Sequence, residues 1–202
     1  MRDLQNYPNS ATASSSYQEM RSDPVGYLYA EHRTQLALCD LLEELFKRPH
    51  VAEAHVWAAE ISYYLARGFQ LHAADEGSDL ARAIRYNSIG NEEKILSRLV
   101  AMHREDLDLA ARLRGELEVF ASGLVPTNAL DFVNTAYDFV ERLREHISWE
   151  NRELLPLAYE LPRGAFRRLG QAISDRHKRS ESDLESNDQW ARVPIHAKGG
   201  AA

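Results

Sequence analysis

Apolar residues recur every three or four positions through four long stretches of the chain, and this spacing limits the possible folds more than any other feature of the sequence. It matches one face of an α-helix, whereas none of the stretches alternates in the manner typical of β-strands. Short connections between long helices favour an up-down-up-down arrangement. The sequence therefore predicts an all-α four-helix bundle, with helices over about residues 23–48, 51–84, 91–120 and 132–157.

The predicted helices carry typical boundary residues. Asp23 is a good N-cap, and Pro24 fits the first helical position. Asn91 is the corresponding cap of the third helix. Gly68 is a position at which the second helix can bend or pack closely. A short, more basic fifth helix is predicted over about residues 163–176.

The chain outside the bundle is largely polar. Its first residues are rich in Ser, Asn and Ala, a composition that favours a flexible tail. The sequence thus predicts a flexible N-terminal tail at 1–22, the bundle at 23–160, and a short helix with a flexible C-terminal tail at 161–202.

Composition and charge exclude several classes of function. A net charge of −7 argues against general nucleic-acid binding, which needs a surplus of Lys and Arg. No apolar run approaches the roughly 20 residues of a membrane span, and the first residues lack the apolar segment of a secretory signal. The single cysteine, Cys39, cannot form an intramolecular disulfide and is expected to be a small buried hydrophobe. We therefore expect a cytoplasmic protein that binds neither nucleic acid nor membrane.

Each long predicted helix carries a histidine on or beside its apolar face. His72 and His146 are followed four residues later by Glu76 and Glu150, and residues at this spacing lie on one face, a turn apart. The other two helices contribute one imidazole each. The candidate metal ligands are therefore His32, His72, Glu76, His103, His146 and Glu150.

Two acidic side chains in an apolar interior require a physical reason. A buried carboxylate is costly unless it is paired or binds a metal, and two neighbouring carboxylates repel until one takes up a proton. Two cations about 3.5–4 Å apart, bridged by the carboxylates, would remove both costs. Mixed imidazole and carboxylate ligands suit iron, manganese or zinc, although structural zinc prefers four-coordinate sites, commonly with Cys.

A metal-free interpretation must be weighed beside this one. A histidine on a helix is more often a surface or hydrogen-bonded core residue than a ligand, and an acid four residues later is often only a helix pair. A metal-free helical interaction protein would, however, have to bury four histidines at once, since each has an apolar residue one turn away. No role is assigned to the remaining histidines, which are His50, His55, His177 and His196.

The order of these motifs resembles the hemerythrin-like, or HHE cation-binding, domain family. The resemblance covers about residues 23–160 and rests on His32, HAADE at 72–76, His103, HISWE at 146–150 and RELLPLA at 152–158. It implies two iron ions with an oxo or hydroxo group between them. By this resemblance His32 and His72 would bind one iron and His103 and His146 the other. Glu76 and Glu150 would bridge the two ions.

The sequence departs from the oxygen carriers of that family in two places. Leu107 stands where their third helix has a second histidine, and the fourth helix has HxxxE in place of their HxxxxD. Tyr29 and Asp106 are candidate replacement donors, although a packing aromatic and a solvated acid are the simpler interpretations. A centre with fewer imidazoles should hold O2 less reversibly and bind peroxide or nitric oxide readily.

We therefore expect a protein that binds or senses a small diatomic ligand or peroxide, or that handles iron. The small ligands in question are O2, peroxide and nitric oxide. A metal-dependent regulatory or interaction module without turnover is the alternative, and the sequence indicates no particular protein partner.

Overall fold

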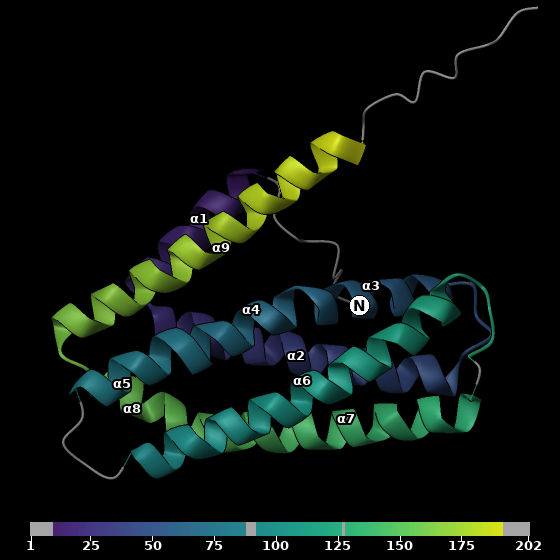
Figure 1. Cartoon of the computed structure of the whole chain (residues 1–202), viewed down its shortest axis with the longest axis horizontal. Coiled ribbons are helices and arrows are strands. Elements are labelled where there is room, and N and C mark those ends of the chain that lie inside the picture. The colour runs from purple at the N-terminus through teal and green to yellow at the C-terminus, as the bar shows by residue number, and fades with distance from the viewer. Residues whose placement is uncertain (1–9, 88–91, 127, 192–202) are drawn as a thin grey trace, which may run out of the picture.

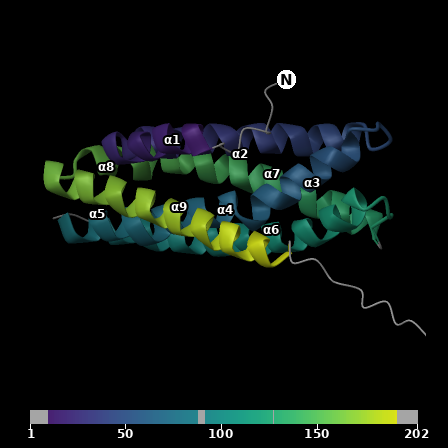
Figure 2. The ribbon, with the colours of Figure 1, turned by 90° about the horizontal axis from the view of Figure 1, so that it is seen from above.

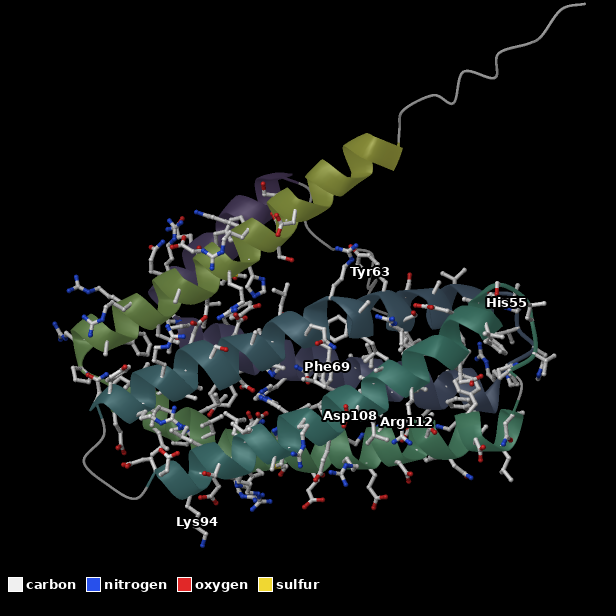
Figure 3. All side chains as sticks on the ribbon, in the orientation of Figure 1. His55, Tyr63, Phe69, Lys94, Asp108 and Arg112 are labelled. Carbon is white, nitrogen blue, oxygen red and sulfur yellow. The ribbon has the colours of Figure 1, made fainter. Side chains whose placement is uncertain are left out.

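The computed structural model describes residues 10–87, 92–126 and 128–191, and throughout these ranges the regular structure is helical, with no strand. Antiparallel helices pack side by side into a bundle, and side chains fill the space between them (Figure 1; Figure 3). This confirms the predicted all-α fold. The bundle consists of α2 (Pro24–Lys47), then α3 (Ala54–Ala66), α4 (Gly68–Ala74), η1 (Asp75–Leu80) and α5 (Ala81–Asn87), then α6 (Glu93–Ala121), then α7 (Ala129–Trp149), η2 (Glu150–Leu154) and α8 (Leu155–Tyr159).

Local hydrogen bonds fix where the bundle helices begin. The Asp23 side chain accepts from the Gly26 backbone N–H at 2.9 Å, and Pro24 occupies the first turn of α2, as the sequence predicts. Asn128 caps α7 in the same way, accepting from the Asp131 N–H at 3.3 Å. The predicted cap at Asn91 lies outside the described residues.

The second bundle helix is not continuous. Arg67 leaves helical geometry, with φ −132° and ψ −69°, directly before Gly68. The bend expected at Gly68 is therefore a break between α3 and α4. Further on, the six-residue π-helical segment η1 separates α4 from α5.

The fourth bundle helix contains the second π-helical segment, η2, between α7 and α8. Pro156 follows it in the first turn of α8. Because proline has no N–H, it cannot continue the regular hydrogen-bonding pattern, which accounts for a change of helical register at this point.

The apolar core is divided into two clusters along the bundle. One contains Leu42, Ile61 and Phe139, and the other contains Leu28 and Leu99. Along every bundle helix, the candidate ligands lie between residues of the first cluster and residues of the second. A polar layer therefore crosses an otherwise apolar interior. Cys39 belongs to the first cluster and is fully buried, as expected.

Two further helices, α1 (Ser10–Ser22) and α9 (Arg163–Ala191), pack against each other outside the bundle (Figure 1; Figure 2). Residues 10–22, which the sequence analysis assigns to a flexible tail, form α1, and the predicted short helix at 163–176 continues to Ala191, through part of the predicted C-terminal tail. Residues 1–9 and 192–202 lie outside the described ranges.

Tertiary contacts explain why these polar segments are helical. Met20 and Ile173 are buried in the second apolar cluster. Arg21 donates from Nε to the Ser174 hydroxyl at 3.1 Å. A Cβ at Gly170 would lie 2.6 Å from the Met20 carbonyl oxygen, so the two helices approach closely there. Local composition does not reveal this pairing. Within the described ranges, no helix combines the length and apolar character of a membrane span.

Candidate metal centre

All six predicted ligands meet in the polar layer of the bundle. They come from α2, from α4 with η1, from α6, and from α7 with η2, so each bundle helix contributes. None of the six is more than 9% exposed to solvent. The spacing of four residues in the two His–Glu pairs is what places each imidazole beside its carboxylate. The buried set comprises His32, His72, Glu76, His103, His146 and Glu150.

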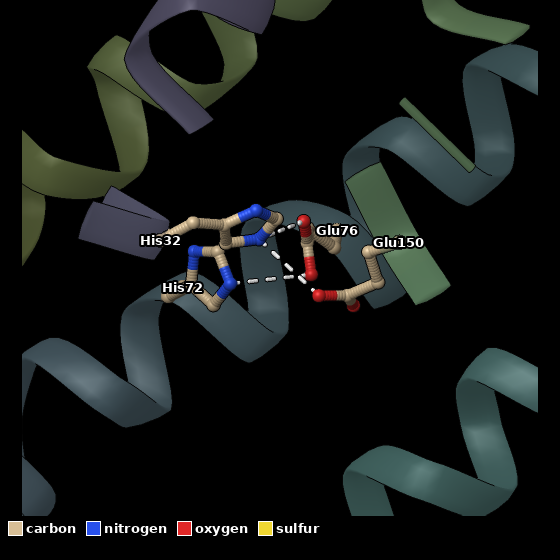
Figure 4. A group of neighbouring side chains, drawn as sticks. All are labelled: His32, His72, Glu76 and Glu150. Atoms are coloured by element: carbon tan, nitrogen blue, oxygen red, sulfur yellow. Dashed lines mark ion pairs between the residues drawn. The ribbon is translucent and has the colours of Figure 1, made fainter. Parts of the chain in front are cut away.

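His32 and His72 form one half of the cluster, with ring centroids 5.0 Å apart. The His32 Nε2 atom lies 3.3 Å from Glu76 Oε1 and 3.2 Å from Glu150 Oε2. The His72 Nε2 atom lies 3.3 Å from Glu76 Oε2. Figure 4 shows both imidazoles directed at the two carboxylates. These four residues bring ligand atoms within 4.8 Å of one another, which is close enough to hold one metal ion.

His103 and His146 form the other half, with ring centroids 5.1 Å apart. The His146 Nε2 atom lies 2.9 Å from Glu150 Oε1. The His103 Nε2 atom lies 3.5 Å from the same oxygen and 3.3 Å from Glu76 Oε2. Together with Glu150 these two histidines make a second group that could hold an ion. Both carboxylates therefore face both histidine pairs.

The donor atoms of this cluster are better arranged for binding a metal than for hydrogen bonding to one another. Although they face each other at 2.9–3.5 Å, several buried ring nitrogens and carboxylate oxygens have no hydrogen-bond partner among the described residues. Buried polar atoms in proteins are normally paired, so such a cluster requires an explanation. Imidazole nitrogen and carboxylate oxygen are ligands that suit iron, manganese and zinc. The unpaired atoms are Nε2 of His32, His103 and His146, both carboxylate oxygens of Glu76, and Oε1 of Glu150.

Each glutamate of the cluster stands at or next to the start of a π-helical segment. Glu76 is the second residue of η1, and Glu150 is the first residue of η2. Single π-helical turns occur frequently at functional sites, where they alter the direction of side chains within a helix. The two His–Glu pairs thus lie in matching local structures on two bundle helices.

Charge balance in the cluster shifts the pKa values of its members. Burial favours neutral rings, but the carboxylates of Glu150 and Glu76 outweigh it and raise the pKa of His32 to about 10. Neighbouring carboxylates likewise raise the pKa of His103 to about 9 and that of His146 to about 10. Burial opposes ionisation of the two glutamates, yet the imidazoles hold the pKa of Glu76 well below its usual range and that of Glu150 at about 2. In the metal-free protein, ring protons supply the positive charge that the carboxylates need.

Two further side chains hold the imidazoles from outside the cluster. Asp106 is buried and accepts a hydrogen bond from His146 Nδ1. The Asn151 side-chain oxygen accepts from His32 Nδ1 at 2.7 Å. The interpretation of Asp106 as a solvated acid is therefore wrong. The reason is the packing of α6 against α7, which places this carboxylate against an imidazole of the next helix.

Tyr29 and Leu107 are packing residues, and His177 is paired with an acidic side chain. Tyr29 is partly buried, stands edge-on to the His32 ring at 6.4 Å, and donates from its hydroxyl to the Asn151 carbonyl at 3.5 Å. Leu107 packs against the first apolar cluster. His177, to which no role was assigned, contacts Asp75 through Nε2 at 2.7 Å, beside the cluster.

The Asp106 and Asn151 contacts were not predicted from the sequence. Asp106 lies three residues after His103, and this spacing suggests a direct ligand or a solvated acid, not a hydrogen bond to a histidine of another helix. Asn151 directly follows Glu150, and a regular helix gives no reason to place both side chains near one centre. Both residues lie in the π-helical segment η2, whose wider turn changes the directions of successive side chains.

A four-helix bundle with an internal cluster of four imidazoles and two carboxylates defines a class of helical metal-binding proteins. Comparison with protein-family models identifies the particular family: the model of the hemerythrin HHE cation-binding domain matches residues 23–158. The chain belongs to this family, which confirms the resemblance found in the sequence. Membership, together with the buried cluster, indicates metal binding and suggests iron. Comparisons with curated proteins and with solved structures found no match.

Proposed function

We propose that this protein is a non-haem di-iron protein that binds or senses O2, peroxide or nitric oxide, or that handles iron. His32 and His72 hold one ion, His103 and His146 hold the other, and Glu76 and Glu150 bridge them. Manganese or zinc would fit the same ligand types. The family match and the two buried groups of ligand atoms support this assignment.

One observation carries the proposal. Glu76 and Glu150 are both almost completely buried, at 0% and 1% exposure, and their oxygens face four imidazole nitrogens. A buried ion pair made only of protonated imidazoles and carboxylates gains little over an apolar core, because taking charges out of water is costly. Two cations bound between the carboxylates would compensate the buried negative charge, which a metal-free bundle leaves to protonated imidazoles.

The donor set also favours reaction with small ligands over closed structural binding. Each position is offered two imidazoles and shared carboxylates, a combination that in non-haem iron proteins leaves room for an exogenous ligand. Bound iron supplies a redox-active Lewis acid at this place. The protein residues orient the ions, and the two apolar clusters around the layer restrict water.

The side of His103 is the natural route of approach for a small ligand. Its side chain is the most exposed of the cluster, at 11%, while the side chains of His32, His72 and His146 are exposed by at most 4%. Gly77 stands beside it, and a Cβ added there would lie 3.4 Å from His103 Nδ1. A side chain this little exposed favours a small ligand, such as a diatomic molecule or a peroxide, over a larger substrate.

A metal-dependent regulatory module is the second candidate. It is favoured by a specific contact outside the bundle: Arg176 and His177 of α9 both contact Asp75, the residue directly before Glu76. A change at the cluster could therefore reach a helix that lies outside the matched family domain. A cytoplasmic location remains a prediction from composition.

Elemental analysis combined with optical spectroscopy tests the proposal. Protein purified from iron-rich culture should contain about two irons per chain. It should also show near-ultraviolet absorption that differs between anaerobic and air-exposed samples and changes on adding peroxide or nitric oxide. Loaded protein that responds to neither ligand would favour the regulatory module. Protein that stays free of metal under these conditions would refute the di-iron assignment.

A further inference from the structure

The two halves of the cluster are supported by different outer residues. On one side, the Asp106 carboxylate accepts a hydrogen bond from His146 Nδ1, and both side chains are only 3% exposed. Because the Nδ1 proton makes this hydrogen bond, it is the Nε2 proton that His146 gives up when it binds a metal, and the Nε2 lone pair then points toward the cluster, where Glu150 Oε1 lies 2.9 Å away. The ring is therefore fixed in orientation and tautomer.

On the other side, the support is an amide. His32 Nδ1 donates to Asn151 Oδ1 at 2.7 Å, and its Nε2 faces both glutamates. This arrangement also fixes the ring and its tautomer. Asn151, however, is neutral, so it cannot increase the electron donation of the imidazole as a carboxylate does.

The remaining two imidazoles lack comparable support. The buried His72 Nδ1 atom has no hydrogen-bond partner among the described residues. For His103, no described side chain accepts a hydrogen bond from Nδ1, and a Cβ added at Gly77 would lie 3.4 Å from this nitrogen. One imidazole in each half is thus held by an outer side chain, and among the described residues only the half containing His146 is held by a charged one.

We propose that Asp106 is a positioning residue that makes the His103–His146 position the tighter and more electron-rich of the two metal positions. This inference rests on the di-iron function proposed above. A ligating imidazole whose other nitrogen donates to a carboxylate is a stronger base toward its metal, and such outer partners typically change metal affinity about 10–100-fold. The ion held by His103 and His146 therefore binds more tightly and is harder to reduce than the ion held by His32 and His72.

The test compares Asp106→Asn with wild-type protein by chelator competition and by redox titration of the iron-loaded form. The variant keeps the size of the side chain but removes its charge. We expect one of the two ions to bind about 10–100-fold more weakly. We also expect one of the two reduction steps to move to a higher potential, while the other step is unchanged.

The matched control is Asp108→Asn, which removes the same charge from the exposed face of α6 two residues away (Figure 3). It should change neither affinity nor potential. If it reproduces the effect of Asp106→Asn, a general change in surface charge is responsible and the inference is wrong. Folding of each variant is checked by circular dichroism of the metal-free form.

If Asp106→Asn does not fold, a surface variant tests the inference in its place. Arg142 Nε lies 3.9 Å from the second oxygen of Asp106, and the Arg142 side chain is 44% exposed. Arg142→Gln removes this cation without entering the core, so the charge of Asp106 should act more fully on His146 and lower the same potential. A variant with unchanged potential contradicts the inference in that case.

The outcomes separate this inference from the proposed function. Wild-type protein that takes up no metal refutes the proposed function itself. Wild-type protein that binds two ions, with Asp106→Asn matching it in both affinities and both potentials, refutes only the inference about Asp106. A variant that is less stable when metal-free but binds metal normally also refutes it, because Asp106 is then only structural.

Discussion

At the scale of single residues, the two buried glutamates decide how the centre behaves. Glu76 lies within 3.3 Å of imidazole nitrogens from three bundle helices, and Glu150 lies within 3.5 Å of three imidazoles as well. Each carboxylate thus links helices that are distant in sequence. Removing one of them should act on metal binding and on stability together.

Replacing Glu76 with alanine should abolish binding of both ions. When the free metal concentration is about a thousand times its Kd, the unfolding free energy of loaded wild-type protein should exceed that of the variant by about 4 kcal/mol. Urea unfolding with and without added iron measures this. Glu141→Ala, an exposed change on α7, is the control and should retain the metal-dependent gain. A Glu76 variant that is as stable as wild type or more stable, whatever the metal, would indicate a metal-free bundle.

The pH dependence of stability should differ between metal-free and loaded protein. The raised pKa values of His32 and His146, about 10 against 6.5 unfolded, give stabilisation that is complete below pH 6.5 and lost as pH rises toward 10. The lowered pKa of Glu150, about 2 against 4.5, gives stabilisation present above pH 4.5 and lost as pH falls toward 2. The metal-free protein should therefore be most stable between these ranges.

Metal binding reverses the trend at high pH, because ligand imidazoles must be neutral. The gain in stability from added metal should thus grow from roughly pH 5.5 to roughly pH 8.5. Unfolding midpoints measured at both pH values, with metal and with chelator, check this. A gain that shrinks as pH rises would mean that these imidazoles do not bind the ion.

The residues of the cluster could be selected from the sequence because they keep the period of an α-helix. His72 with Glu76 and His146 with Glu150 have the spacing that places both side chains on one face. Asp106 and Asn151 could not be assigned their contacts, since these depend on how α6 and α7 pack and on the register of η2. Spacing along one helix carries no information about a neighbour on another.

At the scale of secondary structure, the apolar period predicted the helices but not their interruptions. The break at Arg67 and the π-helical segments η1 and η2 are short. They change the spacing of apolar residues along the sequence very little, so this spacing does not predict them. The α1–α9 pair was missed for another reason: both helices are polar and are stabilised by each other, and helices depend more on such packing than on intrinsic propensity.

A single methyl group should test the close approach of α1 and α9. Gly170→Ala would place Cβ 2.6 Å from the Met20 carbonyl oxygen and 2.8 Å from that of Arg21, both backbone atoms that cannot move freely. We expect a loss of about 1–3 kcal/mol in unfolding free energy. Gly115→Ala on α6 is the matched control, because nothing lies within 4 Å of its Cβ position. It should be stabilising by up to about 1 kcal/mol. Equal effects at both sites would mean that α9 does not pack on α1 in this way.

At the scale of the whole molecule, side chains of α9 directly contact the segment that carries Glu76. Arg176 Nε lies 3.0 Å from Asp75 Oδ1, and the same guanidinium donates to Asp79 at 2.6 Å. His177 Nε2 contacts the other Asp75 oxygen at 2.7 Å. Asp75 is fully buried, so these partners are needed to compensate its charge. The outer layer and the candidate centre therefore share the segment η1.

Arg176→Ala should loosen α9 without removing any candidate ligand. Leaving Asp75 with one partner fewer should cost about 1–3 kcal/mol. Hydrogen exchange of α9 amides should become faster, and Arg179→Ala, an exposed neighbour on the same helix, should leave it unchanged. If α9 exchanges at the same rate in the Arg176 variant and in wild type, the contacts with η1 do not hold this helix in place.

The most direct test of the di-iron account is a crystal of iron-loaded protein measured on both sides of the iron absorption edge. We predict two anomalous peaks in the polar layer of the bundle, one beside His32 and His72 and one beside His103 and His146, with Glu76 and Glu150 between them. The absence of iron peaks from this layer, with both glutamates turned toward solvent, would contradict the account.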